Sequence, residues 1–233
     1  MALAWRHRLT AVPVADLHRI LVGAVPVAGP LDIGRREYEE DLSRLAGIMH
    51  EADHGLTADR ALTDSPWRRA RQRLPWLLVG LIGAVMATAV VARFESAVAG
   101  YVAIAFFIPA IVYLADAVGT QTETVVVRGL AAHDFPFGRL LLGEVTTGAL
   151  LGAVLGCVAL AAIWLFFGDV RLAAAVALTI LAASGVAAAC GPMLPRALDR
   201  LGFDPAFGSG PVATVIQDVL NLPIYFVVLA TWL

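Results

Sequence analysis

The chain is poor in charge and in cysteine, and it contains no lysine. Charged residues make up 15% of its 233 residues and hydrophobic ones 59%, whereas soluble domains are about one quarter charged. A formal net charge of −2 gives no electrostatic reason to expect nucleic acid as a partner. The two cysteines, Cys157 and Cys190, lie in separate apolar runs and indicate neither a disulfide framework nor a metal site. This composition indicates a protein whose solvent is largely lipid.

Histidine is also missing from the long apolar runs. Ser184 and Ser209, each followed by glycine, therefore have no histidine in a matching place. We expect no enzymatic activity, and we expect any metal in the apolar part to be bound by oxygen ligands alone. Oxygen ligands suit hard divalent cations such as Mg²⁺, whereas zinc and copper favour nitrogen or sulfur.

Most of the charge lies before residue 75. Residues 1–64 are expected to form a small cytoplasmic α/β segment, with β-branched runs at 12–16 and 20–27 typical of strands. Residues 31–49 have the apolar spacing of a helix. A segment of this size with so few apolar anchors is too small for a robust core of its own.

Residues 65–75 are expected to form an interfacial helix. Ser65 can cap it with Pro66 at the first helical position. Trp67, Arg68 and Arg71 then precede a long apolar run, a composition typical of the headgroup level of a bilayer. The alternative is an ordinary solvated basic helix.

The rest of the chain, residues 76–233, is expected to be an all-α transmembrane domain. Five apolar runs are each long enough to supply the ~20 residues needed to cross a bilayer. They are residues 74–92, 98–127, 140–167, 172–194 and 206–233. Arginines in the loops predict a cytoplasmic N-terminus and an external C-terminus.

Three acids lie inside these runs, where each costs roughly 2.5–3.5 kcal/mol on insertion scales. They are Asp116, Glu144 and Asp218. Thr214 and Asn221 share a helical face with Asp218, because they are spaced i, i+4, i+7. A polar stripe of this kind predicts an ion pathway. The alternative is that the acids only join helices by hydrogen bonds.

The second apolar run contains a polar stretch around Asp116. Pro109 and Gly119 weaken a helix, so we expect irregular backbone here, which at this depth must line a cavity. Freed carbonyl groups, Thr120 and Gln121 would then join Asp116 as oxygen ligands for a cation.

Two further acids, Asp204 and Glu123, have plainer interpretations, and Glu144 has one as an alternative to lining a pathway. Asp204 can cap the fifth helix with Pro205 at the first helical position, and capping is compatible with cation binding at the cytoplasmic mouth. Glu144 and Glu123 can instead lie near the headgroups.

Several segments resemble the MgtE magnesium channel family. They read FFIPAIVYLADAVGTQTETVVVRGLA, GPMLPRALDRLGFDPA and PVATVIQDVLNLPIYF, and the resemblance covers all five apolar runs in order. It implies a homodimer whose pore is lined by the second and fifth helices of both copies. It also implies that Asp218 holds hydrated Mg²⁺ with its symmetry mate and that Asp204 helps to bind Mg²⁺ at the cytoplasmic side.

The N-terminal part resembles the tail of that family's second CBS domain, followed by the connecting helix that gates the pore. The resemblance therefore assigns gating to Trp67, Arg68 and Arg71, with a truncated regulatory segment before them. One departure falls near the pore: Asp116 lies between two alanines where the family often has Gly-Gly-Asn.

The sequence thus predicts a Mg²⁺ channel or transporter in the cytoplasmic membrane, with Asp116, Gly119, Thr120, Gln121, Glu144, Thr214 and Asn221 near Asp218. Two alternatives stay open. One is a proton- or sodium-coupled carrier for Mn²⁺ or Co²⁺, and the other is an inactive regulatory membrane subunit.

Overall fold

The computed structural model describes residues 11–15, 20–26, 64–132, 136–202 and 209–232. The chain divides into two compact units, residues 1–43 and 44–233. In the first unit, strand β1 (Ala11–Ala15) pairs with strand β2 (Leu21–Pro26) in an antiparallel hairpin. Both predicted strands are confirmed, whereas the helix expected at 31–49 lies outside the described residues.

Every element that the structure describes in the second unit is a helix, and five of these helices are long and apolar enough to cross a membrane. The predicted fold class and number of spans are therefore confirmed. The helices in chain order are α4 (Pro66–Arg93), the short α5 (Glu95–Gly100), α6 (Ala103–Ala132), α7 (Phe137–Phe167), α8 (Val170–Arg200) and α9 (Ser209–Trp232).

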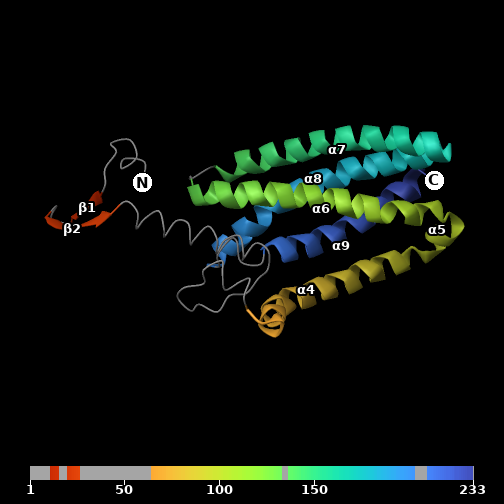
Figure 1. Ribbon diagram of the computed structural model, residues 1–233. Coiled ribbons are helices and arrows are strands. Elements are labelled where there is room, and N and C mark those ends of the chain that lie inside the picture. Colours follow the sequence, from red (N-terminus) through yellow and green to blue (C-terminus); the bar gives the residue numbers. More distant parts are fainter. Residues whose placement is uncertain (1–10, 16–19, 27–63, 133–135, 203–208, 233) are drawn as a thin grey trace. The chain divides into compact units, whose positions relative to one another are not determined.

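Helix α8 is the centre of the bundle and packs against α6, α7 and α9 (Figure 1). The contact with α7 is close because Gly148, Gly152 and Gly156 repeat every four residues along α7. A Cβ at Gly152 would approach the Cα of Leu181 to 2.8 Å. Small residues at this spacing let two helix backbones approach in lipid, where no hydrophobic force joins helices.

Helix α4 lies on the opposite side of the bundle from α7 (Figure 1). It packs on α9, where Gly83 faces the side chain of Val215. Only 6% of its apolar window is buried, against 61% for α8. The expected interfacial helix and the first span form one continuous helix, with Pro75 inside it.

Two expectations about α6 are wrong. The second span begins at Ala103, and residues 95–100 form the separate helix α5. Helix α6 also continues through Pro109 and Gly119, so the freed carbonyl groups expected there do not occur. Proline is tolerated in spanning helices where neighbours compensate the lost hydrogen bond. For the same reason α8 continues through Pro192 and Pro195 to Arg200, beyond the expected end at residue 194.

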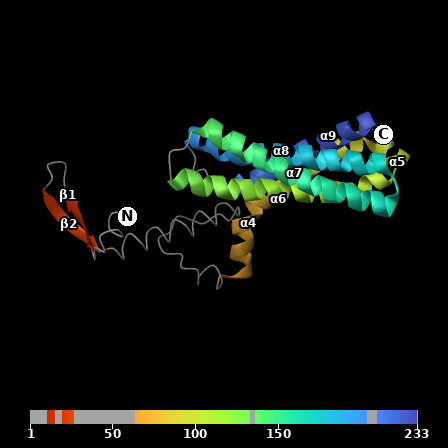
Figure 2. The ribbon, with the colours of Figure 1, turned by 90° about the horizontal axis from the view of Figure 1, so that it is seen from above.

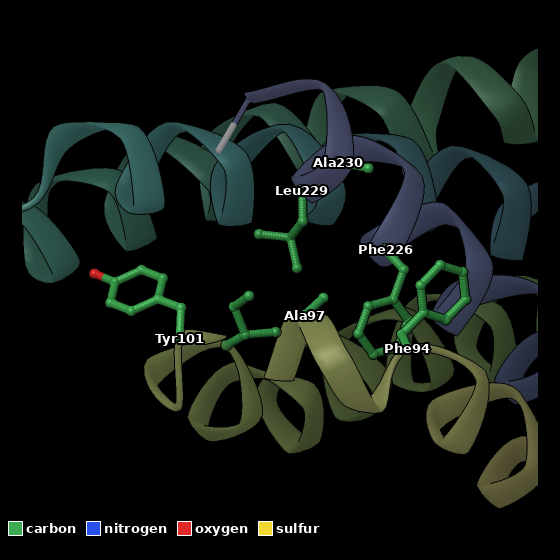
Figure 3. Close-up of a pocket in the computed structure, with 7 residues that line it drawn as sticks. Phe94, Ala97, Tyr101, Phe226, Leu229 and Ala230 are labelled. Atoms are coloured by element: carbon green, nitrogen blue, oxygen red, sulfur yellow. The ribbon is translucent and has the colours of Figure 1, made fainter. Parts of the chain in front are cut away.

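The end of the bundle near α5 is held by aromatic packing. The rings of Phe94 and Phe226 stack with centroids 4.3 Å apart. The buried Tyr225 hydroxyl donates to the carbonyl of Ile104 at 2.9 Å. A pocket at this end is lined by Phe94, Ala97, Tyr101, Ile104, Phe226, Leu229 and Ala230 (Figure 3). Its lining is almost wholly apolar, so it offers no ligand set for a cation.

Candidate functional site between α6 and α9

The polar contact of the bundle lies where α6 meets α9. Gln217 is 1% exposed, and its carboxamide occupies the space that a side chain at Gly119 would need. Because glycine has no Cβ, α6 can approach α9 closely at this level. The contact brings a polar segment of α9 against a polar segment of α6.

Two acids flank this contact. Asp218 follows Gln217 on α9, and Asp116 lies one turn before Gly119 on α6. Both side chains are half-buried, and the charge of Asp116 acts on Asp218 across the helix pair. In each carboxylate the Oδ1 atom is buried and has no hydrogen-bond partner within the described residues. Two like charges held together in this way are stabilised by a cation.

Asn221 extends the polar row along α9. It is 0% exposed, one turn beyond Gln217, and neither atom of its carboxamide has a hydrogen-bond partner in the part of the chain described. A buried amide without partners costs about 1–3 kcal/mol. Thr214 lies on the same side of α9 and is half-buried. The row from Thr214 to Asn221 therefore supplies hydroxyl, amide and carboxylate oxygens, the ligands that Mg²⁺ and other hard cations prefer.

The structure does not bring every predicted site residue to this contact. Thr120 and Gln121 are exposed on α6. Glu144 is half-buried on α7, which packs mainly against α8. Within one subunit these three residues do not join Asp218, and their place in a pore stays a prediction. Asp204 lies outside the described residues.

The predicted gating residues lie at the start of α4. Trp67 is 79% exposed, and the guanidinium of Arg68 forms an ion pair with Asp64 at 3.5 Å. Ser65 caps the helix as expected, because its Oγ accepts a hydrogen bond from the backbone N–H of Arg68 at 3.4 Å. Arg71 is exposed. None of these contacts by itself tests a gating role.

Sequence reasoning missed two buried polar residues. Gln217 was not among the predicted site residues, yet its carboxamide fills the space beside Gly119 of α6. Glu123 was predicted only to lie near the headgroups, and the structure shows in addition that it is 2% exposed, where Gly191 of α8 approaches α6. For Glu123, the spacing in the sequence could have indicated its burial, since Glu123 follows Asp116 by seven residues and shares its helical face.

A family model described as a divalent cation transporter, MgtE, matches residues 108–228. That range includes Asp116 and Gly119 of α6 and Gln217, Asp218 and Asn221 of α9. A magnesium transporter MgtE of Enterococcus faecalis is 35% identical over 219 residues, covering 93% of this chain and 46% of the relative.

Two further relatives carry the same name. The Bacillus subtilis protein is 31% identical over 224 residues, with 95% of this chain and 48% of the relative covered. The Thermus thermophilus protein is 31% identical over 219 residues, with 93% and 47% covered. The chain thus spans about half the length of these relatives.

Proposed function

The chain belongs to the MgtE family of divalent cation transporters, and from this premise we propose that it passes Mg²⁺ across the cytoplasmic membrane. The observation that carries the proposal is the pair Asp116 and Asp218, half-buried in spanning helices beside the unpartnered amide of Asn221. Acids inside spanning helices mark ion pathways. The magnesium transporters to which the chain is similar support Mg²⁺ as the ion.

Asp218 is the central ligand of this proposal. Mg²⁺ gives up its waters reluctantly and binds through one or two carboxylates. In a homodimer, Asp218 and its symmetry mate would supply two carboxylates to one hydrated ion. Asp116, Thr214 and Asn221 would accept hydrogen bonds from the waters of that ion. The half-burial of Asp218 within one subunit agrees with a ligand that completes its site in the assembly.

The proposed orientation places the N-terminus in the cytoplasm. Arginines gather where α4 begins, where α6 and α7 join and where α8 ends, while only Arg93 and Arg171 lie at the other end of the spans. An excess of arginine marks the cytoplasmic side. With five spans, the C-terminus would then lie outside.

Ion uptake into liposomes tests the proposal. The purified chain is reconstituted with a Mg²⁺-sensitive dye inside the vesicles, and Asp218→Asn is compared with the unmodified protein. We expect uptake to fall at least about tenfold, since the substitution is present in both copies of the homodimer and removes both carboxylates of the site; a tenfold loss corresponds to ~1.4 kcal/mol of ion binding. Glu95→Gln is the matched control, because Glu95 is exposed on α5. Unchanged uptake by Asp218→Asn would refute the pore assignment.

A second candidate function is a proton- or sodium-coupled carrier for Mn²⁺ or Co²⁺, and the proximity of Asp116 to Asp218 favours it. Intramembrane acids also serve proton relays. Uptake that follows an imposed pH or sodium gradient, and loses this dependence in Asp116→Asn, would support the carrier. Absence of any flux, together with a thermal stability that does not respond to metal, would support an inactive regulatory subunit.

A further inference from the structure

The first third of α4 carries a concentrated positive charge. Between Pro66 and Trp76 the sequence has four arginines and no acid. Arg68 pairs with Asp64. Within the described residues, Arg69, Arg71 and Arg73 have no ion pair. Three cationic side chains in one short helical segment thus have no opposite charge paired with them among the residues that the structure describes.

The same segment is amphipathic. Trp67, Ala70 and Leu74 follow one another at i, i+3, i+7 and lie along one edge of the helix. Trp67 is 79% exposed and Leu74 is 53% exposed, so this apolar edge is open. Arg69 and Arg73 lie one turn apart on the other edge, while Arg71 borders the apolar edge next to Trp67. An apolar edge with tryptophan and an arginine-rich opposite edge are typical of helices that lie in the plane of a membrane surface.

The direction of the segment agrees with that position. The first turns of α4 are viewed nearly along their axis in Figure 1 and lengthwise in Figure 2, where they run across the direction of the other long helices. The helix contains Pro75, and proline is a usual cause of a helix kink. The remainder of α4 is apolar and long enough to span the bilayer. This arrangement suits a position of the basic segment at the level of the lipid headgroups.

We propose that residues 66–74 form a binding surface for anionic phospholipid headgroups. The phosphate of a lipid such as phosphatidylglycerol accepts hydrogen bonds from arginine in a bidentate geometry, while Trp67 and Leu74 contact the upper acyl chains. The positive charge of this segment favours an anionic lipid over a zwitterionic one, because each arginine at a charged leaflet strengthens binding by about fivefold. The segment continues directly into the spanning part of α4, and this favours lipid over a soluble acidic partner.

This surface has a physical connection to the ion site. Helix α4 packs on α9 at Gly83 and Val215, and Val215 is adjacent to Thr214. A change in how lipid holds α4 would therefore reach the helix of Asp218. This consequence rests on the proposed function, but lipid binding itself does not.

Native mass spectrometry of the full chain in detergent tests the binding. Phosphatidylglycerol or phosphatidylcholine is added, and the number of bound lipids is measured for the unmodified protein and for Arg69→Gln/Arg73→Gln. We expect the unmodified protein to prefer phosphatidylglycerol, and we expect that preference to fall roughly 25-fold in the double variant, at about fivefold for each arginine removed. The matched control is Arg93→Gln/Arg171→Gln, which removes the same charge at the other end of the bundle and should keep most of the preference.

Equal binding of the two lipids by the unmodified protein would overturn the proposal, as would equal losses in the two double variants. A second measurement on the unmodified protein does not depend on any variant folding. The preference for phosphatidylglycerol should weaken at about 0.5 M salt, because exposed charges are screened at that ionic strength, and a preference unaffected by salt would also refute it. Uptake in liposomes with and without phosphatidylglycerol then tests the connection to α9. Lipid binding without any Mg²⁺ uptake would refute the proposed function and leave this surface supported.

Discussion

The carboxamide of Gln217 on α9 fills the space beside Gly119 on α6 that any larger residue would occupy. This contact lets the two helices that carry Asp116 and Asp218 approach closely at the level of these acids. It therefore links helix packing directly to the geometry of the candidate cation site.

The first prediction concerns that contact. In Gly119→Ala the new methyl group meets the flexible end of the Gln217 side chain, so the side chain can move and the fold should persist. Displacement of Gln217 should change the oxygen positions around Asp218 and lower Mg²⁺ uptake several-fold, with little change in the thermal midpoint. Gly185→Ala is the control, since nothing lies within 4 Å of a Cβ at that position. Equal uptake by the two variants would show that the contact does not serve the ion site.

The second prediction concerns Asp116. In Asp116→Asn the side chain keeps its shape but loses one charge beside Asp218. If both acids act on one cation, the concentration of Mg²⁺ at half-maximal uptake should rise about tenfold, which corresponds to ~1.4 kcal/mol. Liposome uptake measured over a range of Mg²⁺ concentrations provides the value, with Glu95→Gln as the control on α5. An unchanged half-maximal concentration would remove Asp116 from the site.

The third prediction separates helix packing from function. A Cβ at Gly152 would lie 2.8 Å from the Cα of Leu181 and 2.9 Å from the Cβ of Ser184. Because the backbone of α8 cannot yield as a side chain can, Gly152→Ala should destabilise the bundle by about 1–3 kcal/mol. Gly143→Ala on the same helix meets nothing within 4 Å and should be neutral or slightly stabilising. Thermal unfolding in detergent compares the two, and similar midpoints would contradict the close packing of α7 on α8.

The fourth prediction concerns a hydrogen bond between Tyr101, the C-cap of α5, and Asp169, the N-cap of α8. The hydroxyl of Tyr101 donates to Oδ2 of Asp169 at 2.8 Å. Oδ1 of Asp169 accepts from the backbone N–H groups of Arg171 and Leu172 at 2.9 and 3.1 Å. The Leu172 N–H and the Tyr101 hydroxyl lower the pKa of Asp169 below 3.8. The carboxylate in turn raises the pKa of Tyr101 above 10.0.

The signs of these two pKa shifts define a pH window. A lowered pKa at Asp169 stabilises the fold above pH 3.8, and this contribution is lost as the pH falls through the lowered value. A raised pKa at Tyr101 stabilises the fold below pH 10.0, and this contribution is lost as the pH rises through the raised value. Tyr101→Phe should therefore cost about 1 kcal/mol near neutral pH, and the cost should shrink at strongly acidic pH.

Thermal midpoints at several pH values test this window. Tyr113→Phe is the matched control, because Tyr113 is 73% exposed on α6 and should show no cost at any pH. A cost for Tyr101→Phe that does not depend on pH would show that the hydroxyl contributes by packing and not through the ionised Asp169.

Much of the fold was predictable because lipid imposes a simple rule on sequence. A helix that crosses the bilayer must be apolar over its length, so hydropathy marks each span. The strands at 11–15 and 21–26, the cap at Ser65 and the five spans all follow from local composition. Helix boundaries were less predictable. Proline is a weak stop signal in lipid, and α8 accordingly continues through Pro192 and Pro195.

The partners of the polar residues could not be predicted from local patterns. Spacing placed Thr214, Asp218 and Asn221 on one face of a helix but could not say which helix would meet that face. Gln121 was grouped with Asp116 because it is close in sequence, yet on α6 it is exposed and lies away from the Gly119 contact. The sequence predicts Glu144 near the other acids. Glu144 lies on α7, however, and α7 packs mainly on α8, not on the helices that carry Asp116 and Asp218.

The sequence by itself determined that this chain is a helical membrane protein of the MgtE family, because hydropathy and motif order are properties of the chain alone. The tertiary structure decided which polar groups meet. The missing side chain at Gly119 leaves room for Gln217, so that Asp116 and Asp218 come near each other. The missing side chain at Gly83 likewise leaves room for α4 to pack on α9. Such pairings depend on the shapes of two surfaces that are distant in sequence. In lipid, this close fit determines which helices pack together more than hydrophobicity does.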